Sequence, residues 1–266
     1  MSISIIRSRA QIGIEAPLIV VETHISNGLP ALSIVGMPET SVRESKDRVR
    51  SALLNSQFKF PKQRITINLA PADLPKEGGR FDLAIALGIL AASEQIPKKA
   101  LEQYECVGEL SLSGELRPII GSLPVAIHTR NAKKKLILPR DNSAEAALIK
   151  QAELIPASSL LEVCAHISGQ KSLDTYIPET ISVDEKHTLD FSDVQGQFHV
   201  KRAFEVAATG AHNLIMLGPP GTGKSMLAAR LPSIMPELTE QQAQETAAIA
   251  SISDKGLDVS NWLCPP

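Results

Sequence analysis

The chain has 266 residues, of which 43% are hydrophobic and 21% are charged, so it can bury the cores of one or two globular domains. Its formal net charge of −2 and its 3% of aromatic residues argue against a strongly basic nucleic-acid-binding domain and against a platform for stacking single-stranded bases. No apolar run reaches the roughly 18 residues that span a bilayer, and the N-terminal residues lack a secretory signal, so we expect a cytoplasmic protein with no membrane partner.

The first part of the chain predicts β-strands. Residues 3–9, 14–26 and 32–35 are rich in Ile and Val and are broken by Gly28 and Pro30. Branched apolar side chains bounded by turn residues are typical of strands. We therefore expect three early strands.

Residues 38–55 predict a helix with one apolar face and one charged face. The apolar side chains recur at helical spacing: Val42, Val49, Ala52 and Leu53. The charged side chains have both signs: Arg43, Glu44, Lys46, Asp47, Arg48 and Arg50. This mixture is typical of a solvated face, and a contact with DNA or with another subunit is the alternative.

A strand and a loop lead into the most apolar helix of the sequence. Residues 64–69 alternate as a half-buried strand does, and residues 70–82 hold two prolines and two glycines, which favour a loop. Residues 83–93 are almost all apolar, and Asp82 stands in the first turn of the helix, where a carboxylate interacts favourably with the helix dipole.

The next segment predicts alternating helices and strands. Residues 106–111 and 115–118 flank Gly114 as in a β-hairpin. After the hairpin we expect helix 123–131, strand 135–138, helix 144–151, strand 154–155 and helix 159–167. Together these elements predict a mixed α+β domain over residues 1–169.

Two motifs in this domain resemble the proteolytic domain of Lon proteases. They are Pro-Lys-Glu-Gly at residues 75–78, before the apolar helix, and the run at residues 108–119. The Lon family places a nucleophilic Ser just after the first motif and activates it with a Lys on the helix after the second. The resemblance therefore implies a Lon-like fold for residues 1–169.

The proteolytic groups themselves are replaced in this sequence. The Ser position is Arg80, and the Lys position is Val125, or Ala126 if a one-residue gap is allowed. An arginine cannot attack a carbonyl, and neither aliphatic residue can accept a proton. We therefore predict no catalytic residue in this domain, and Lys76, Arg80 and Asp82 are left without an assigned role.

Residues 170–189 are largely polar, contain Pro178 and predict a linker between domains. The second domain, residues 190–266, begins with the run 191–197 and a helix at 200–209. Residues 213–217 are a short apolar run of the length that a buried parallel strand needs. A helix at 226–231 is expected after the loop that follows this strand.

That loop contains the one motif in the sequence that indicates a specific chemical function. Residues 218–225 fit the phosphate-binding pattern G-x-x-x-x-G-K-[ST] between a predicted strand and a predicted helix. Glycines let backbone N–H groups turn toward a phosphate chain, Lys224 would reach the β- and γ-phosphates, and the Ser225 hydroxyl would ligate Mg²⁺. We therefore predict ATP and Mg²⁺ as cofactors, bound by Gly218, Pro219, Pro220, Gly221, Thr222, Gly223, Lys224 and Ser225.

Taken together, the Lon-like segment, the linker, the run 191–197 and the phosphate loop resemble the ComM/YifB family of magnesium-chelatase-like AAA+ ATPases. The resemblance continues through residues 231–236 and 248–252, and Thr239 with Gln242 forms a capping box for a helix ending near residue 250. It implies an ATP-driven homo-hexamer that moves on DNA, with a role in branch migration during natural transformation.

The sequence departs from that family after residue 262, where we would expect a Walker B strand, sensors, an arginine finger and a lid. No hydrophobic strand ending in paired acids follows Ser225, so we expect this chain alone to bind ATP without hydrolysing it. The expected fold is thus a Lon-like domain followed by an incomplete α/β P-loop module. The alternative is a truncated, non-catalytic binding or subunit-packing module, and magnesium-chelatase-type or Lon-type activity is a weaker alternative.

Overall fold

The structure, a computed structural model, describes residues 2–178, 189–236, 238–253 and 257–263. The chain forms two compact units. The first comprises Met1–Glu179 with Ala248–Leu257, and the second comprises Thr180–Ala247 with Asp258–Pro266. Within the described residues, no helix is long and apolar enough to cross a membrane.

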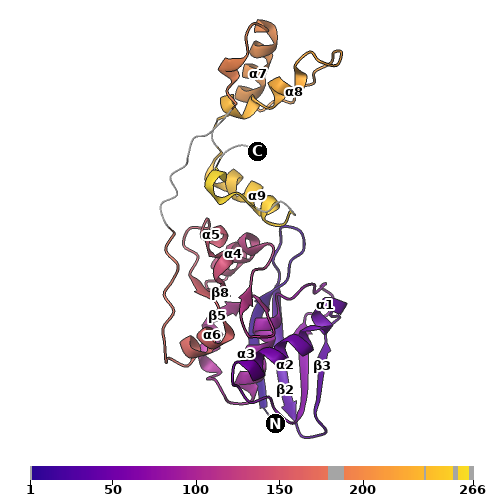
Figure 1. Cartoon of the computed structure of the whole chain (residues 1–266), viewed down its shortest axis with the longest axis vertical. Coiled ribbons are helices and arrows are strands. Elements are labelled where there is room, and N and C mark those ends of the chain that lie inside the picture. The colour runs from indigo at the N-terminus through magenta and orange to yellow at the C-terminus, as the bar shows by residue number, and fades with distance from the viewer. Residues whose placement is uncertain (1, 179–188, 237, 254–256, 264–266) are drawn as a thin grey trace. The chain divides into compact units, whose positions relative to one another are not determined.

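The first unit is a mixed α/β fold built on one seven-stranded sheet (Figure 1). Its strand order is β3-β4-β2-β1-β5-β8-β9, and four of its six strand pairs are parallel. The strands are β1 (Ser2–Arg9), β2 (Leu18–Ser26), β3 (Ala31–Val35), β4 (Arg64–Ala70), β5 (Tyr104–Cys106), β8 (Lys135–Pro139) and β9 (Leu154–Ala157).

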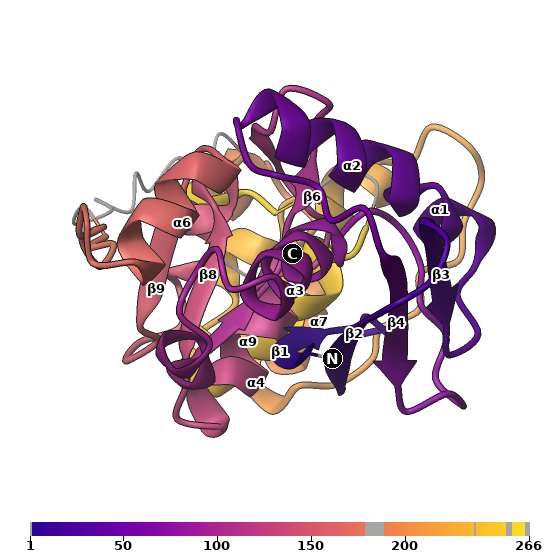
Figure 2. The ribbon, with the colours of Figure 1, turned by 90° about the horizontal axis from the view of Figure 1, so that it is seen from below.

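One half of this sheet, β3-β4-β2-β1, is covered on one face. Helix α3 (Asp82–Ala92) packs on β1 and β2, and helix α2 (Ser45–Asn55) packs on α3 (Figure 2). Burial alternates along β2 and β4, and the β1 residues Ile3 and Ile5 are exposed. This is the expected pattern for strands that bury one face and expose the other.

Helix α3 is the centre of the core, because every one of its residues is buried. A helix that is apolar on all sides needs neighbours on all sides. The sheet covers one side of α3, and α2 and the short strand β6 (Glu109–Leu110) contact it elsewhere.

The other half of the sheet, β5-β8-β9, is parallel, and nearly all of its residues are buried. Helix α4 (Ser122–Asn131) packs on β8, and α5 (Ser143–Ala146) and α6 (Leu160–Ile167) pack on β9. Parallel strands with cover on both faces are near-continuously apolar. The sequence predicts strands at the positions of β8 and β9, but it does not predict β5 as a strand of this sheet.

Most predicted elements of this unit are confirmed, with four corrections. Strand β2 starts only at Leu18, because Ile12 and Glu15 close a tight turn through two backbone hydrogen bonds of 3.0 Å. The predicted helix 38–55 is broken at Glu44 into α1 (Thr40–Arg43) and α2. Cys106 belongs to the large sheet, so the hairpin is only β6 with β7 (Leu116–Arg117), and the helix predicted at 144–151 is only the short α5.

Two of the three cysteines lie in the described part of the chain. Cys106 and Cys164 are free and buried, and burial raises the pKa of the Cys164 thiol to about 12. Cys264 lies outside the described residues.

The predicted linker, residues 170–189, is described only as far as residue 178 and at residue 189. Its first part is attached to the first unit. The Leu173 N–H donates to Nδ1 of His166 at 2.9 Å, and the Tyr176 N–H donates to the Leu154 carbonyl at 2.9 Å. Residues 173–176 therefore run beside the edge strand β9.

The second unit contains helices only, among its described residues. They are η3 (Phe191–Asp193), α7 (Phe198–Gly210), α8 (Lys224–Ala228), η4 (Leu231–Ile234) and η5 (Val259–Asn261), while α9 (Glu240–Ser251) crosses the division between the units. Phe191, Val194, Phe204 and Leu227 form its apolar cluster, with the two phenyl rings 5.4 Å apart.

The strand predicted at residues 213–217 is wrong for this structure. The segment is not a strand, and Ile215 and Leu217 are 82% and 89% exposed. A β-strand exists only through hydrogen bonds to a neighbouring strand, and the described part of the second unit offers none. The apolar run therefore has the composition of a strand without the partner that would make it one.

A buried ion pair joins the two halves of the large sheet. The Arg9 guanidinium on β1 donates to both carboxylate oxygens of Glu105 on β5, at 2.7 and 2.8 Å, and the two residues are 6% and 1% exposed. The Thr129 hydroxyl on α4 donates to the same carboxylate at 2.6 Å, and Arg9 also donates to the Ala16 carbonyl at 2.9 Å. Both charges are thus paired and hydrogen-bonded, which a buried pair requires.

Replacing Arg9 by Met should lower the free energy of unfolding by about 3 to 5 kcal/mol, because the Glu105 carboxylate would stay buried without its cation. Urea unfolding followed by circular dichroism measures this loss. The control is Arg7→Met on the same strand, since Arg7 makes one exposed hydrogen bond to the Glu102 carbonyl. An equal loss in both variants would show that the buried pair has no special weight.

Candidate functional site

The phosphate loop, residues 218–225, precedes and opens helix α8. Gly221 and Gly223 have φ angles of +81° and +83°. Side chains of L-residues are strained in this left-handed region, whereas glycine adopts it freely. The two glycines therefore let the loop turn back on itself directly before the helix.

The Lys224 ammonium lies against the backbone of this loop. It donates to the Gly218 carbonyl at 2.8 Å, to the Pro219 carbonyl at 2.7 Å and to the Thr222 hydroxyl at 3.3 Å. The Thr222 hydroxyl in turn donates to the Pro219 carbonyl at 3.0 Å. The loop thus surrounds the Lys224 ammonium. A cation in this position can pair with the negative charge of a phosphate chain.

The start of α8 adds donors to the same place. The N–H groups of Lys224 and Ser225 belong to the first turn of the helix, where N–H groups have no partner within the helix. The Ser225 side chain is exposed and can reach a metal ion. Glycine backbone, one cation and one hydroxyl are a donor set that fits a nucleotide phosphate with Mg²⁺.

Packing from the run 191–197 holds the helix behind this loop. Leu227 of α8 lies in the apolar cluster with Phe191, and the Phe191 N–H donates to the Ser233 hydroxyl at 3.0 Å. Asp193 lies 3.6 Å from the Arg230 guanidinium. The run 191–197 therefore packs against helix α8 and the segment that follows it. No periodicity of the sequence indicates this contact.

Comparisons with known proteins agree with this arrangement of motifs. Residues 21–142 match the family described as subunit ChlI of Mg-chelatase, and residues 190–266 match the family described as magnesium chelatase, subunit ChlI. The competence protein ComM of Haemophilus influenzae is 48% identical over 266 residues, which is 98% of this chain and 52% of ComM.

Two further relatives have no assigned function in their names. The protein YifB of Escherichia coli is 49% identical over 262 residues, covering 98% of this chain and 52% of YifB. An uncharacterized protein of Mycobacterium tuberculosis is 37% identical over 242 residues, covering 91% of this chain and 48% of that protein.

The chain belongs to the ComM/YifB family. It spans about half the length of these relatives. The phosphate loop lies within the segment that matches magnesium chelatase, subunit ChlI.

In this ComM/YifB-family chain, the positions that the Lon resemblance assigns to the nucleophile and the base have structural contacts. Arg80 is 8% exposed, donates to the Ile120 carbonyl at 3.0 Å and also donates to the Gln11 side chain. Burial lowers the pKa of Arg80 to about 10. Val125 and Ala126 are fully buried in α4, the helix that begins two residues after Ile120.

Lys76 of the same loop also has a structural place. It is fully buried, and its ammonium donates to the Gly36 carbonyl at 2.9 Å and to the Pro71 carbonyl. Lys76 thus joins the turn after β3 to the end of β4. Burial lowers the pKa of this ammonium, because the charged form is the one that loses solvation.

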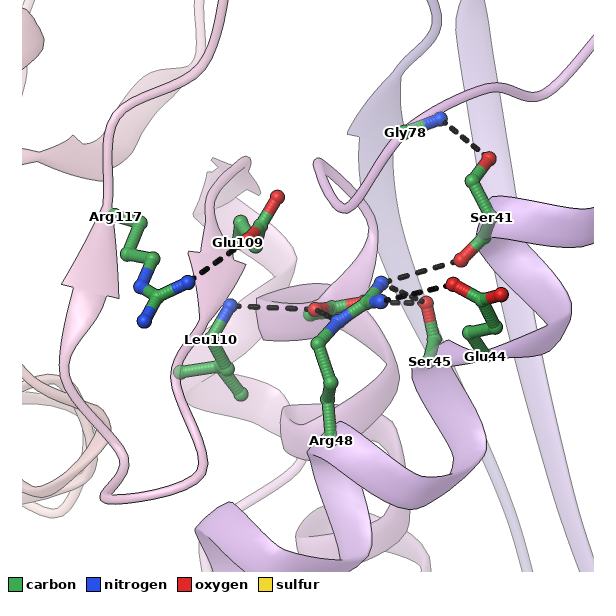
Figure 3. A network of polar contacts seen from close by, with 9 residues as sticks. Ser41, Glu44, Ser45, Arg48, Gly78, Glu109, Leu110 and Arg117 are labelled. Carbon is green, nitrogen blue, oxygen red and sulfur yellow. Dashed lines mark hydrogen bonds and ion pairs between the residues drawn. The ribbon is translucent and has the colours of Figure 1, made fainter.

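Asp82 is the acceptor of a network that Figure 3 shows from close by. Its carboxylate is fully buried and accepts from Arg48 Nε at 2.8 Å, from Arg48 Nη2 at 3.2 Å, from the Ser45 hydroxyl and from the Leu110 N–H at 3.3 Å. The hydrogen bond to Asp82 raises the pKa of Arg48. The interpretation of Arg48 as part of a solvated helix face is therefore wrong.

This network also reaches the loop of the Lon-like motif. Arg48 donates to the Ser41 carbonyl at 3.2 Å, and the Ser41 hydroxyl accepts from the Gly78 N–H at 3.0 Å (Figure 3). The signal that could have revealed it is an aspartate at the head of a wholly apolar helix, since a carboxylate buried there needs a cation. The sequence pattern does not say which arginine supplies it.

Replacing Arg48 by Met should lower the free energy of unfolding by about 3 kcal/mol, because the Asp82 carboxylate would lose its only cationic partner among the described residues. The double variant Arg48→Met/Asp82→Leu should regain a large part of that loss. Arg50→Met, on the exposed face of the same helix, is the control and should cost less than about 1 kcal/mol. Equal effects in thermal unfolding of Arg48→Met and Arg50→Met would contradict this account.

Proposed function

We propose that the chain binds ATP and Mg²⁺ through residues 218–225, as the nucleotide-binding part of a ComM-type AAA+ ATPase. The observation that carries this proposal is the position of Lys224, whose ammonium lies within the loop at 2.8 and 2.7 Å from the Gly218 and Pro219 carbonyls. A phosphate chain would exchange these carbonyl contacts for charge-assisted ones, which are stronger.

Each part of the loop has its own task in this proposal. The backbone from Gly218 to Gly223 surrounds the phosphates, Lys224 pairs with the β- and γ-phosphates, and the Ser225 hydroxyl ligates Mg²⁺. When bound, Mg²⁺ neutralises the phosphate charge between the terminal groups. The contacts of Phe191 and Asp193 with the segment behind α8 keep the loop in place.

The wider role follows from the family. Because one relative is named a competence protein, and because the resemblance implies a homo-hexamer that moves on DNA, we propose DNA branch migration in natural transformation as the process served. We also propose residues 1–169 as a Lon-like, non-proteolytic domain, residues 170–189 as a linker and residues 190–266 as the start of the ATPase module. The contact of Arg80 with Ile120, just before α4, supports the Lon-like arrangement.

A second candidate function is a non-catalytic binding or subunit-packing module. The observation that favours it is the segment before the phosphate loop, where Ile215 and Leu217 are exposed and no strand holds the loop from that side within the described part of the unit. A loop held from one side only must be ordered further by the ligand, and this ordering reduces affinity. The affinity for Mg-ATP therefore distinguishes the two functions.

Lys224→Ala should weaken Mg-ATP binding by at least about 10-fold, because a charge-assisted contact with the phosphates contributes about 1.5 to 3 kcal/mol. Isothermal titration calorimetry of the wild-type chain and the variant measures the change. The control is Lys201→Ala on α7, a lysine outside the loop, which should bind as the wild type does.

Two results would contradict the proposal. One is wild-type affinity in Lys224→Ala, which would place the nucleotide elsewhere. The other is no measurable binding by the wild-type chain, which would favour the non-catalytic module. Ser225→Ala tests the metal site separately. This variant should weaken ATP binding in the presence of Mg²⁺ more than it weakens binding without the metal.

A further inference from the structure

One end of the large sheet gathers exposed cations. Strands β1 and β4 begin at this end and β2 ends there, as the pairs Ser2 with Ile25 and Ser26 with Arg64 show. It lies at the lower end of the first unit in Figure 1. The cations of this surface, named here the basic end, are all exposed: Lys59, Lys62, Arg64, Lys98 and Lys99.

Specific contacts bring these residues together from three parts of the chain. The Lys59 backbone accepts from and donates to the Gln95 side chain, at 2.8 and 2.9 Å, so the loop after α2 is joined to the segment after α3. The Lys98 ammonium donates to the Ser2 hydroxyl at 2.6 Å, which places that segment at the start of β1. The basic end is therefore one continuous surface.

The charge of this surface is unbalanced. The segments that form it are residues 2–5, 24–31, 57–64 and 94–99, and Glu94 is their only acidic residue. None of its five cations takes part in an ion pair with another described residue. The chain as a whole has a net charge of −2, so this excess is local and does not follow from composition.

The cations are spread over the width of several strands. Arg64 on β4 and Ser2 on β1, which Lys98 contacts, are separated by two strand spacings, about 10 Å. Separate cations can therefore contact separate phosphates of a duplex, which carries one negative charge per about 1.7 Å of its axis. A shallow hollow of about 570 Å³ beside Lys98 is lined by Ser168 and Gln170, and also by the carboxylate of Glu94. Serine and glutamine side chains donate to phosphate oxygens without reading bases, whereas Glu94 disfavours an anion on its side of the hollow.

We propose that the basic end binds the phosphate backbone of a nucleic acid. The excess of cations at this end favours a phosphate backbone, which is bound mainly through its charge. An acidic protein or an anionic lipid surface would also use exposed apolar side chains, which at this end are Leu29, Ile3 and Ile5, at 88%, 57% and 52%. The test below separates these partners.

This inference names a contact surface for the DNA partner of the proposed function, yet it rests on different residues. Because no residue of the phosphate loop belongs to the basic end, Lys224→Ala should leave nucleic-acid binding without nucleotide unchanged. Loss of ATP binding and loss of nucleic-acid binding can therefore be observed separately.

The test is fluorescence anisotropy with a labelled duplex of about 30 base pairs, without nucleotide, between about 50 and about 200 mM KCl. The variant Lys59→Gln/Lys62→Gln/Arg64→Gln should bind at least about 10-fold more weakly at about 100 mM KCl. The slope of log affinity against log salt should fall by about 2 to 3, since three phosphate contacts are lost.

The matched control is Arg43→Gln/Arg117→Gln/Arg140→Gln. These three exposed arginines lie at the end of α1, on β7 and directly after β8, outside the basic end, and the variant removes the same charge. Equal weakening in both variants, or none in the first, would overturn the proposal. It would also be overturned if vesicles containing phosphatidylserine bound the chain as tightly as the duplex and lost that binding in the first variant, since this would indicate a lipid surface.

Discussion

The buried pair of Arg9 and Glu105 is the contact on which the first unit depends, because it joins two sheets of different character into one. On the Arg9 side the strands are covered on one face, and on the Glu105 side they are parallel and buried on both. A single aligned ladder position, Arg7 with Glu105, pairs β1 with β5. The backbone pairing between these two strands is therefore short. The ion pair and the Thr129 hydroxyl reinforce the junction between β1 and β5.

Charged residues serve the same structural purpose elsewhere in this unit. Asp82 with Arg48, and Lys76 with two carbonyls, join loops and helices around α3. These residues lie in or beside the motif that resembles the Lon nucleophile loop. From the same loop, Arg80 donates a hydrogen bond to the backbone just before α4. The Asp82 carboxylate and the Lys76 ammonium are thus satisfied within the protein, whereas Nη1 of the buried Arg80 has no hydrogen-bond partner among the described residues. The phosphate loop of the second unit is the better candidate for the chemistry of the chain.

The sequence allowed much of this to be predicted, and the failures share one cause. Alternation along β2 and β4 and the apolar run of α3 are local patterns, and the phosphate loop is a local motif, so each could be read without the fold. The strand at residues 213–217 and the role of Arg48 depend on partners far away in the sequence. An apolar run becomes a strand only beside another strand, and Arg48 leaves the solvated face only because it contacts a buried acid. Neither partner can be identified from a local sequence pattern.

The central claim is that residues 218–225 hold the phosphates of ATP. Hydrogen–deuterium exchange of the chain with and without Mg-ATP tests it most directly, because the method locates the ligand on the backbone. We expect slower exchange in peptides that cover residues 218–228, smaller protection around Phe191, and none in β1 or β2. Unchanged exchange across the phosphate loop at saturating Mg-ATP, or protection confined to the first unit, would contradict the claim.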